Sequence, residues 1–379
     1  MTSFHLPVRI ITGDGCFSHL GEVAASLGRR ALVVCGASAR RSGTLARAQE
    51  MLASGGVESA AFDGVSGEPT LACVEEAMEA ARASSASLVV GLGGGSAIDV
   101  AKATSGLAPL EGGPRDYFAG REIDGAPLPW IAMPTTSGTG AEVTMNAVLI
   151  DETSGAKQSI RSEAWFARAA LVDPELTLSM PPQITAHSGA DALCQAIETF
   201  VSLGAMPITD ALCREAIRLT GRSLLPAYLD GQDIQARRDM HYGSLMAGMA
   251  LANARLGAVH GIAHPLGGHY RLPHGLVCGL LLPYVMEWNL PVATERYAEV
   301  GELMGLAVDR RQLEAAARAT VEGIQRLMGD IGIPEKLSQA GIGAIDYSVV
   351  ARESMSSSMK HNPRPMSEED VQALLRRAM

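Results

Sequence analysis

The histidines of this chain gather in one short segment. Only nine occur in 379 residues, yet His260, His264, His269 and His274 fall within 15 positions. Residues four apart share one face of a helix, so His260 and His264 would lie side by side. His274 follows a proline in a predicted turn, which can aim its side chain back at that face. A lone histidine is usually a core or surface residue, but this cluster predicts a divalent metal site with an open position for substrate.

Asp191 is the carboxylate expected to complete this site. It lies at the start of a predicted helix over residues 190–202. Gln195 stands one turn later on the same face, and its amide oxygen is a further candidate ligand. Glu198 is the competing carboxylate, which we expect either to support a ligand or to lie at the surface.

A glycine-rich turn in the first half is suited to phosphate. A predicted strand over residues 88–92 runs into Gly93, Gly94, Gly95 and Ser96, and then into a helical stretch. Backbone N–H groups in such a turn approach phosphate oxygens closely, and the helix N-terminus favours the anion. Ser96 is expected to cap that helix. The spacing is neither G-x-G-x-x-G nor a P-loop, so the turn alone is equally compatible with a bend that binds nothing.

A second stretch of glycines and hydroxyl side chains, residues 134–144 (PTTSGTGAEVT), also follows a predicted strand. The carboxyl ends of parallel strands open onto one crevice, so both loops would face the same ligand. Together the two loops favour a dinucleotide.

The elements that must carry these residues differ between the two halves of the chain. Short apolar runs at 31–35, 88–92 and 130–133 predict buried parallel strands, and 45–53 and 71–83 have helical spacing. This alternation predicts a Rossmann-like parallel sheet with helices on both faces.

The second half has few strand-like runs and predicts an all-helical domain. We therefore expect an α/β dinucleotide-binding domain over residues 1–179 and a helical metal and substrate domain over 180–379. The expected helices cover residues 190–202, 207–221, 237–263, 311–328 and 368–378.

Composition limits the partners. The formal net charge of −10 argues against nucleic acid and against an anionic membrane surface. The six cysteines lie far apart without a C-x-x-C pair, which is typical of reduced cytosolic thiols. The N-terminus lacks the pattern of a signal peptide, and no run of about 18 apolar residues predicts a membrane span. We expect a soluble, cytoplasmic protein.

With these motifs in view, the chain resembles the iron-containing (group III) alcohol dehydrogenases, in the superfamily that also includes glycerol dehydrogenase and dehydroquinate synthase. The resemblance runs nearly end to end. It is carried by residues 93–102 (GGGSAIDVAK), 134–144, 173–176 (DPEL), 189–198 (GADALCQAIE), 260–268 (HGIAHPLGG), 273–275 (PHG) and 362–364 (NPR).

The resemblance implies a nicotinamide cofactor, NADP or NAD, and a metal ion, iron or zinc, in a cleft between an α/β and a helical domain. It implies Asp191, His260 and His274 as metal ligands, with His264 as the catalytic residue near nicotinamide and substrate. The cofactor-binding residues that follow are Gly36, Ser38, Gly94, Gly95, Ser96, Asp99, Thr135, Thr136, Thr144, Asn146 and Lys157.

Two departures from the family pattern affect metal and cofactor. Gln195 replaces the usual histidine one turn after the aspartate, which predicts zinc instead of iron, a weakly held metal, or none. Gly36 replaces an aspartate common after the first strand, and Ser38, Arg40 and Arg41 are placed to receive a 2′-phosphate, which favours NADP over NAD. The alternative is that both arginines are simply solvated.

The resulting hypothesis is a metal-dependent NAD(P)-linked oxidoreductase that interconverts a small alcohol and its aldehyde or ketone, as a homodimer or higher homo-oligomer. Its alternatives are a metal-independent reductase of the maleylacetate reductase type, a lyase like dehydroquinate synthase, and a metal-free nucleotide-binding protein.

Overall fold

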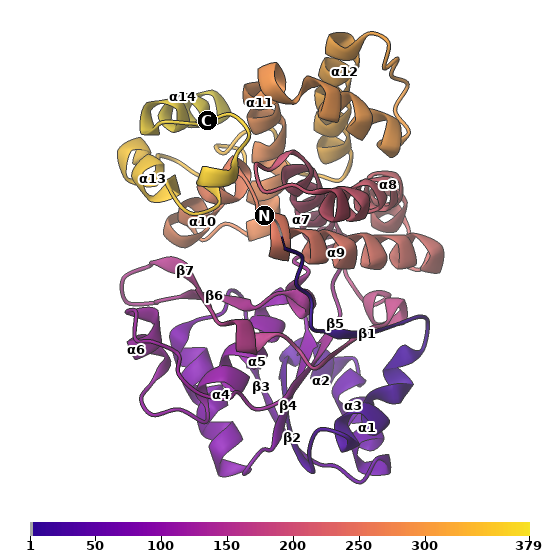
Figure 1. The fold of residues 1–379 in the computed structure, drawn as a ribbon, viewed down its shortest axis with the longest axis vertical. Helices are drawn as coiled ribbons and strands as arrows, with labels where there is room; N and C mark the ends of the chain where they lie inside the picture. The colour runs from indigo at the N-terminus through magenta and orange to yellow at the C-terminus, as the bar shows by residue number, and fades with distance from the viewer. Residues whose placement is uncertain (1–2) are drawn as a thin grey trace. The chain divides into compact units, whose positions relative to one another are not determined.

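The structure, a computed structural model, describes residues 3–379. The chain divides into two compact units (Figure 1). The first, the sheet unit, comprises Leu6–Thr136 and Ala141–Ser179. The second, the helical unit, comprises Met180–Met379 together with Ser137–Gly140 and the residues up to His5.

The sheet unit is built on a parallel sheet, which the described residues form from six strands in the order β1-β8-β5-β4-β2-β3. The predicted Rossmann-like parallel sheet is therefore confirmed. Its strands are β1 (Arg9–Thr12), β2 (Arg30–Gly36), β3 (Glu58–Val65), β4 (Leu88–Gly93), β5 (Trp130–Pro134) and β8 (Ala169–Val172). A separate antiparallel hairpin consists of β6 (Asn146–Ile150) and β7 (Lys157–Arg161).

The central strands are buried because their sequences are continuous apolar runs that need cover on both faces. Helices α1 and α3 lie on one side of the sheet in Figure 1, and α4 and α6 lie on the other. The helices of this unit are α1 (Leu20–Ala25), α2 (Ala37–Arg41), α3 (Thr44–Ser54), α4 (Leu71–Ala83), α5 (Gly95–Leu107) and α6 (Pro114–Phe118).

The helical unit confirms the predicted all-helical second half. Its helices are α7 (Pro182–Val201), α8 (Pro207–Leu229), α9 (Ile234–Ala254), α10 (Ala258–Tyr270), α11 (His274–Met304), α12 (Leu313–Asp330), α13 (Tyr347–Ser354) and α14 (Glu368–Ala378). Their apolar faces meet in one large buried core.

The expectation of one helix over residues 237–263 is wrong. The chain leaves the helix at Arg255, which has a φ of 69°, and α10 begins three residues later. A backbone with positive φ cannot continue a right-handed helix, although the apolar spacing runs on through the break. The break separates His260 from α9.

Helix α11 was not predicted. It is apolar on most of its surface and contains Pro283 and Pro291, so it shows neither helical periodicity nor an uninterrupted sequence of helix formers. Its length and composition would allow it to cross a membrane, but it is largely buried against its neighbours as the core helix of this unit.

Candidate active site

Asp191 lies in the middle of α7, with its side chain buried. The expectation that it opens a helix is wrong, because α7 begins at Pro182, where a proline occupies the first helical position. Its carboxylate is therefore held on a rigid core helix.

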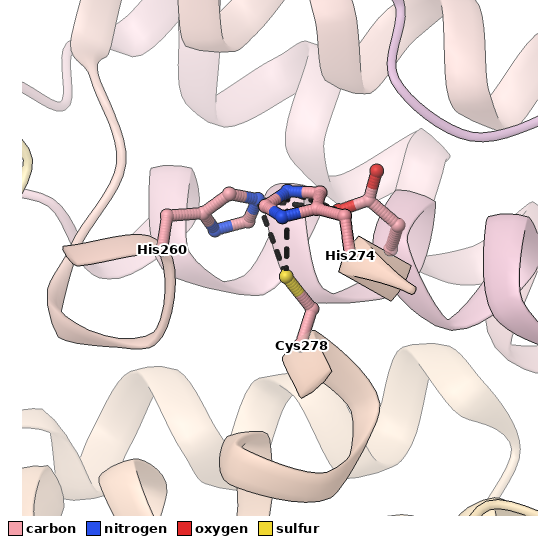
Figure 2. Close-up of side chains that lie close together, drawn as sticks. His260, His274 and Cys278 are labelled. Carbon is pink, nitrogen blue, oxygen red and sulfur yellow. Dashed lines mark hydrogen bonds and ion pairs between the residues drawn. The ribbon is translucent and has the colours of Figure 1, made fainter. Parts of the chain in front are cut away.

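His260 and His274 bring their imidazoles to this carboxylate from two further helices (Figure 2). The Nε2 atoms of His260 and His274 lie 3.2 and 3.8 Å from Oδ1 of Asp191. The two ring centroids are 5.3 Å apart. A buried carboxylate converging with two imidazoles fits a divalent metal such as zinc or iron.

The sequence interpretation missed Cys278, the nearest further donor. It lies one turn after His274 on α11, fully buried, and its Sγ is 3.6 Å from Nε2 of His274 and 3.8 Å from Nε2 of His260 (Figure 2). Asp191, His260, His274 and Cys278 thus form one group whose donor atoms all lie within 4.8 Å of one another. His274 and Cys278 are four apart, a spacing that would have indicated Cys278 only if this segment had been recognised as a helix.

Glu198 fixes the orientation of His260. The Nδ1–H of His260 donates to Oε2 of Glu198 over 2.6 Å, and the backbone N–H of Val259 donates to Oε1 over 2.6 Å. One buried carboxylate therefore sets the ring tautomer and holds the first turn of α10, leaving Nε2 for the metal site. Of the two roles expected for Glu198, support of a ligand is the one the geometry fits.

The charges around His260 favour a cation. Burial lowers the pKa of His260, but Cys278 and the carboxylates of Asp191 and Glu198 outweigh it and hold the pKa well above its ordinary value. Metal ions and protons compete for such a site, so a bound metal would take the place of that proton.

Gln195 is buried one turn from Asp191, as predicted, and its Nε2 donates to Oδ2 of Asp191 over 3.0 Å. Its Oε1 is buried without a hydrogen-bond partner among residues 3–379. Because its amide nitrogen points toward Asp191, Gln195 orients the Asp191 carboxylate through this hydrogen bond.

His264 lies near the imidazoles of both His260 and His274. Its ring centroid is 6.5 Å from that of His260 and 5.6 Å from that of His274, with the His274 ring nearly parallel. His269, the fourth member of the sequence cluster, points elsewhere: its Nε2 is 2.7 Å from Glu353 at the surface.

In the sheet unit, the predicted cofactor residues Gly36, Gly94, Thr135 and Thr136 gather where neighbouring strands end. β4 lies between β2 and β5, and the backbone N–H of Thr135 donates to the carbonyl of Gly93 over 2.9 Å. A Cβ on Gly94 would lie 3.1 Å from the Thr136 side chain, which would have to shift by a few tenths of an ångström to accommodate it. Helix α5 begins at Gly95, and its N-terminus faces this edge.

The expectation that Ser96 caps α5 is wrong. The cap residue is Gly94, which has no side chain to accept a hydrogen bond, and Ser96 lies inside the first turn. The first N–H groups of α5 therefore receive no side-chain cap, which suits an anion at this terminus.

Three other predicted cofactor residues surround a buried lysine. The Nζ of Lys102 donates to Oγ1 of Thr144 over 2.9 Å and to the carbonyl of Asn146 over 2.7 Å, and lies 3.6 Å from Asp99. Burial lowers the pKa of Lys102, against the opposing effect of Asp99 and of Glu142. Lys102 thereby ties the start of the β6–β7 hairpin to α5.

Lys157 and Ser38 have other neighbours, although the charge of Lys157 also acts on Asp99. Lys157, on β7, pairs with Glu68 over 2.6 Å. Ser38 is exposed on α2, where Arg40 forms an ion pair with Asp63 from β3. The sequence interpretation considered the arginines but missed Asp63, which is distant in sequence.

The second glycine loop is shared between the two units. Ser137–Gly140 groups with the helical unit, where Oγ of Ser137 lies 3.0 Å from Nδ1 of His241. Cβ atoms on Gly138 and Gly140 would meet Ser188 at 2.9 Å and Gly248 at 2.5 Å, so both glycines permit close backbone packing. Only Thr135 and Thr136 of this loop stay with the glycine turn at residues 93–95.

Comparison with known proteins identifies the class. Residues 7–174 match the model described as iron-containing alcohol dehydrogenase, and residues 185–379 match that of the Fe-containing alcohol dehydrogenase family, C-terminal. The chain is 37% identical over 371 residues to 1,3-propanediol dehydrogenase of Klebsiella pneumoniae, covering 97% of this chain and 96% of that one. It is 32% identical over 381 residues to NAD-dependent methanol dehydrogenase of Bacillus methanolicus, covering 100% of both.

Solved structures agree. A 1,3-propanediol oxidoreductase superposes with a TM-score of 0.95 at 36% identity over 100% of both chains. Sulfoacetaldehyde reductase from Bifidobacterium kashiwanohense in complex with NAD+ gives 0.90 at 30% identity, over 100% of this chain and 98% of that one. Fold and comparisons together define a nicotinamide-dependent alcohol dehydrogenase. The chain belongs to the iron-containing alcohol dehydrogenase family.

As predicted from the motifs, the protein is an NAD(P)-linked, metal-dependent oxidoreductase that interconverts alcohols and aldehydes. The comparisons do not favour the metal-independent reductase or the metal-free nucleotide-binding protein.

Proposed function

We propose that Asp191, His260 and His274 hold the divalent metal and that the substrate is a small aldehyde or its primary alcohol. The observation that carries the metal assignment is the convergence of one carboxylate and two imidazoles from three buried helices. The substrate class is supported by the relatives reported above, whose names give 1,3-propanediol, methanol and sulfoacetaldehyde as substrates.

The chemistry divides between the bound groups and the chain. The metal supplies Lewis-acid polarisation of the substrate oxygen, and the nicotinamide supplies or accepts hydride. The chain orients the proposed metal ligands: Glu198 fixes the His260 ring, and Gln195 donates to the Asp191 carboxylate. In the reductive direction one proton must also reach the carbonyl oxygen.

For the cofactor we propose that Gly94, Gly95 and Ser96 hold the pyrophosphate and that Thr135, Thr136, Thr144, Asn146 and Lys157 contact the remaining parts, with Asp99 supporting Lys102. Gly36 ends β2 and Ser38 follows on α2, at the place where the adenosine ribose of the cofactor would be bound. Arg40 can bind a 2′-phosphate only by leaving Asp63. The ratio of NADPH to NADH activity therefore measures whether Arg40 pairs with the 2′-phosphate of the cofactor or with Asp63.

We further propose that residues 1–179 act as the cofactor domain and 180–379 as the metal and substrate domain, in a cytoplasmic homodimer or larger homo-oligomer. The dispersed cysteines support the reducing compartment.

Metal removal tests this function. We expect protein purified without chelator to contain about one divalent ion per chain and to oxidise NADH or NADPH with small aldehydes. Chelation should remove the activity, and zinc or iron should restore it. Elemental analysis and cofactor absorbance provide the two measurements. Full activity after complete stripping would contradict the proposal.

His264 is proposed to carry the proton to or from the substrate oxygen, because it stacks on His274 at the edge of the metal site. We expect His264→Ala to lower turnover by roughly 100-fold, the usual loss of a general acid, while the metal content stays near that of the unaltered protein. His269→Ala is the matched control, since that ring pairs with surface Glu353. Unchanged turnover in His264→Ala would exclude the role.

A further inference from the structure

Position 195 provides no imidazole for the metal, and the amide nitrogen of Gln195 is engaged with the carboxylate of Asp191. Nε2 of Gln195 donates to Oδ2 of Asp191 over 3.0 Å, so the side chain presents a donor to the site's carboxylate. A metal ligand must present a lone pair, which this nitrogen lacks. The proposed ligand set from α7 and α10 therefore contains one carboxylate oxygen and one imidazole.

Helix α11 contributes more than His274. Cys278 follows four residues later, so both side chains project from one face of the helix toward His260 (Figure 2). The sulfur is fully buried and lies 3.6 and 3.8 Å from the two Nε2 atoms. These contacts place a potential thiolate on the same side of the imidazoles as the expected metal.

The distances match a coordination polyhedron. With zinc–nitrogen bonds of about 2.05 Å and a zinc–sulfur bond of about 2.3 Å, tetrahedral ligands place nitrogen and sulfur roughly 3.6 Å apart. The same bonds place nitrogen and oxygen roughly 3.4 Å apart. The structure has 3.6 and 3.8 Å for the sulfur edges, and 3.2 and 3.8 Å for the Asp191 edges. Ligation would therefore need shifts of only a few tenths of an ångström.

We propose that Cys278 is the fourth protein ligand of the metal, supplying a thiolate from α11 where Gln195 supplies no nitrogen from α7. The Cys278 thiol would give up its proton on binding the metal, whose chemistry toward the substrate would remain that of a Lewis acid. The inference rests on the metal site proposed above. A soft sulfur donor also shifts the site's preference from iron toward zinc.

A second buried cysteine helps to distinguish metal ligation by Cys278 from the packing of Cys278 as an ordinary buried thiol. Cys194, on α7, hydrogen-bonds Cys278, and burial raises the pKa of Cys194 well above its ordinary value. If Cys278 were only a packed thiol, it would serve as the partner of Cys194 and the metal spectrum would contain no sulfur contribution. Cys213, buried in the same helical unit and outside the cluster, provides a matched control.

Substitution of the metal with cobalt tests directly for a thiolate ligand. The full-length, metal-stripped protein is titrated with Co²⁺ and followed by absorption. We expect visible d–d bands together with a near-ultraviolet thiolate-to-cobalt charge-transfer band. Cys278→Ser should lose the charge-transfer band, keep d–d bands, and bind cobalt at least about 10-fold more weakly, because altering even a residue that only supports a ligand typically costs that much. Cys213→Ala should keep both sets of bands.

A compensating double variant supplies the fourth protein ligand from α7 instead of from α11. Gln195→His combined with Cys278→Ala should regain cobalt affinity without the charge-transfer band and take up more iron relative to zinc than the unaltered protein. In the unaltered protein, d–d bands without a charge-transfer band would overturn the thiolate ligand and leave the metal-dependent function standing. Absence of any cobalt binding would overturn both the thiolate ligand and the metal-dependent function. These outcomes are measured on the unaltered protein, so they do not depend on whether a variant folds.

Discussion

Asp191→Asn is expected to lower kcat/KM for aldehyde reduction by at least about 1,000-fold and to leave the protein nearly free of metal. The substitution keeps the size of the side chain but removes the negative charge on which the two imidazoles converge. Loss of Lewis-acid stabilisation costs several kcal/mol of transition-state energy, and about 4 kcal/mol corresponds to this factor.

The measurement pairs metal analysis with steady-state kinetics under added zinc. Asp210→Asn is the control, because Asp210 is a mostly buried carboxylate of the same helical unit and pairs with Arg296 away from the metal site. Asp210→Asn should keep its metal. An Asp191→Asn protein with normal metal content and normal turnover would show that the ligands lie elsewhere.

Gly275→Ala is the second change with a large expected effect, although residue 275 has no side chain to act in the reaction. A Cβ there would lie 2.0 Å from the carbonyl oxygen and 2.6 Å from the carbonyl carbon of His187. Both are backbone atoms of α7, so α7 and the first turn of α11 would have to separate. We expect about 3 kcal/mol of lost stability, the upper end for overpacking, and at least about 10-fold weaker metal binding.

Metal affinity falls in this prediction because His274 is the residue next to Gly275 and would move with it. Gly329→Ala is the matched control, since it lies in α12 with nothing within 4 Å of its added Cβ. This control should be neutral or more stable by about 0.5 kcal/mol. Denaturant unfolding and metal titration measure the two effects. If Gly275→Ala kept the stability and the metal affinity of the unaltered protein, α7 and α11 could separate without a loss of folding free energy.

The features recoverable from sequence were those with local signals. The strands at β2, β4 and β5 were found because each is a continuous apolar run. The histidine cluster was visible because rare side chains recur within a short segment, and the resemblance to the family singled out Asp191, His260 and His274, whose side chains the structure brings together. Each of these signals is contained in a few adjacent residues.

What escaped prediction depends on contacts between distant segments. Cys278 was missed because α11 carries two prolines and is apolar nearly all round, so neither its helix nor the His274–Cys278 face was visible. Asp63 on β3 meets Arg40 on α2, and Ser137–Gly140 packs against α7 and α9 through glycines. No local pattern specifies such pairings, since tertiary packing decides them.

The double role of Glu198 has a consequence for when the metal can arrive. Its carboxylate holds the His260 ring and the first turn of α10 through hydrogen bonds that require no ion. The ordering of these groups is therefore completed when the chain folds. Loading is then an exchange of ions at a finished site, unlike that of a zinc finger, which is unfolded until metal binds. A newly made chain is accordingly expected to order Glu198 and the His260 ring before its metal arrives.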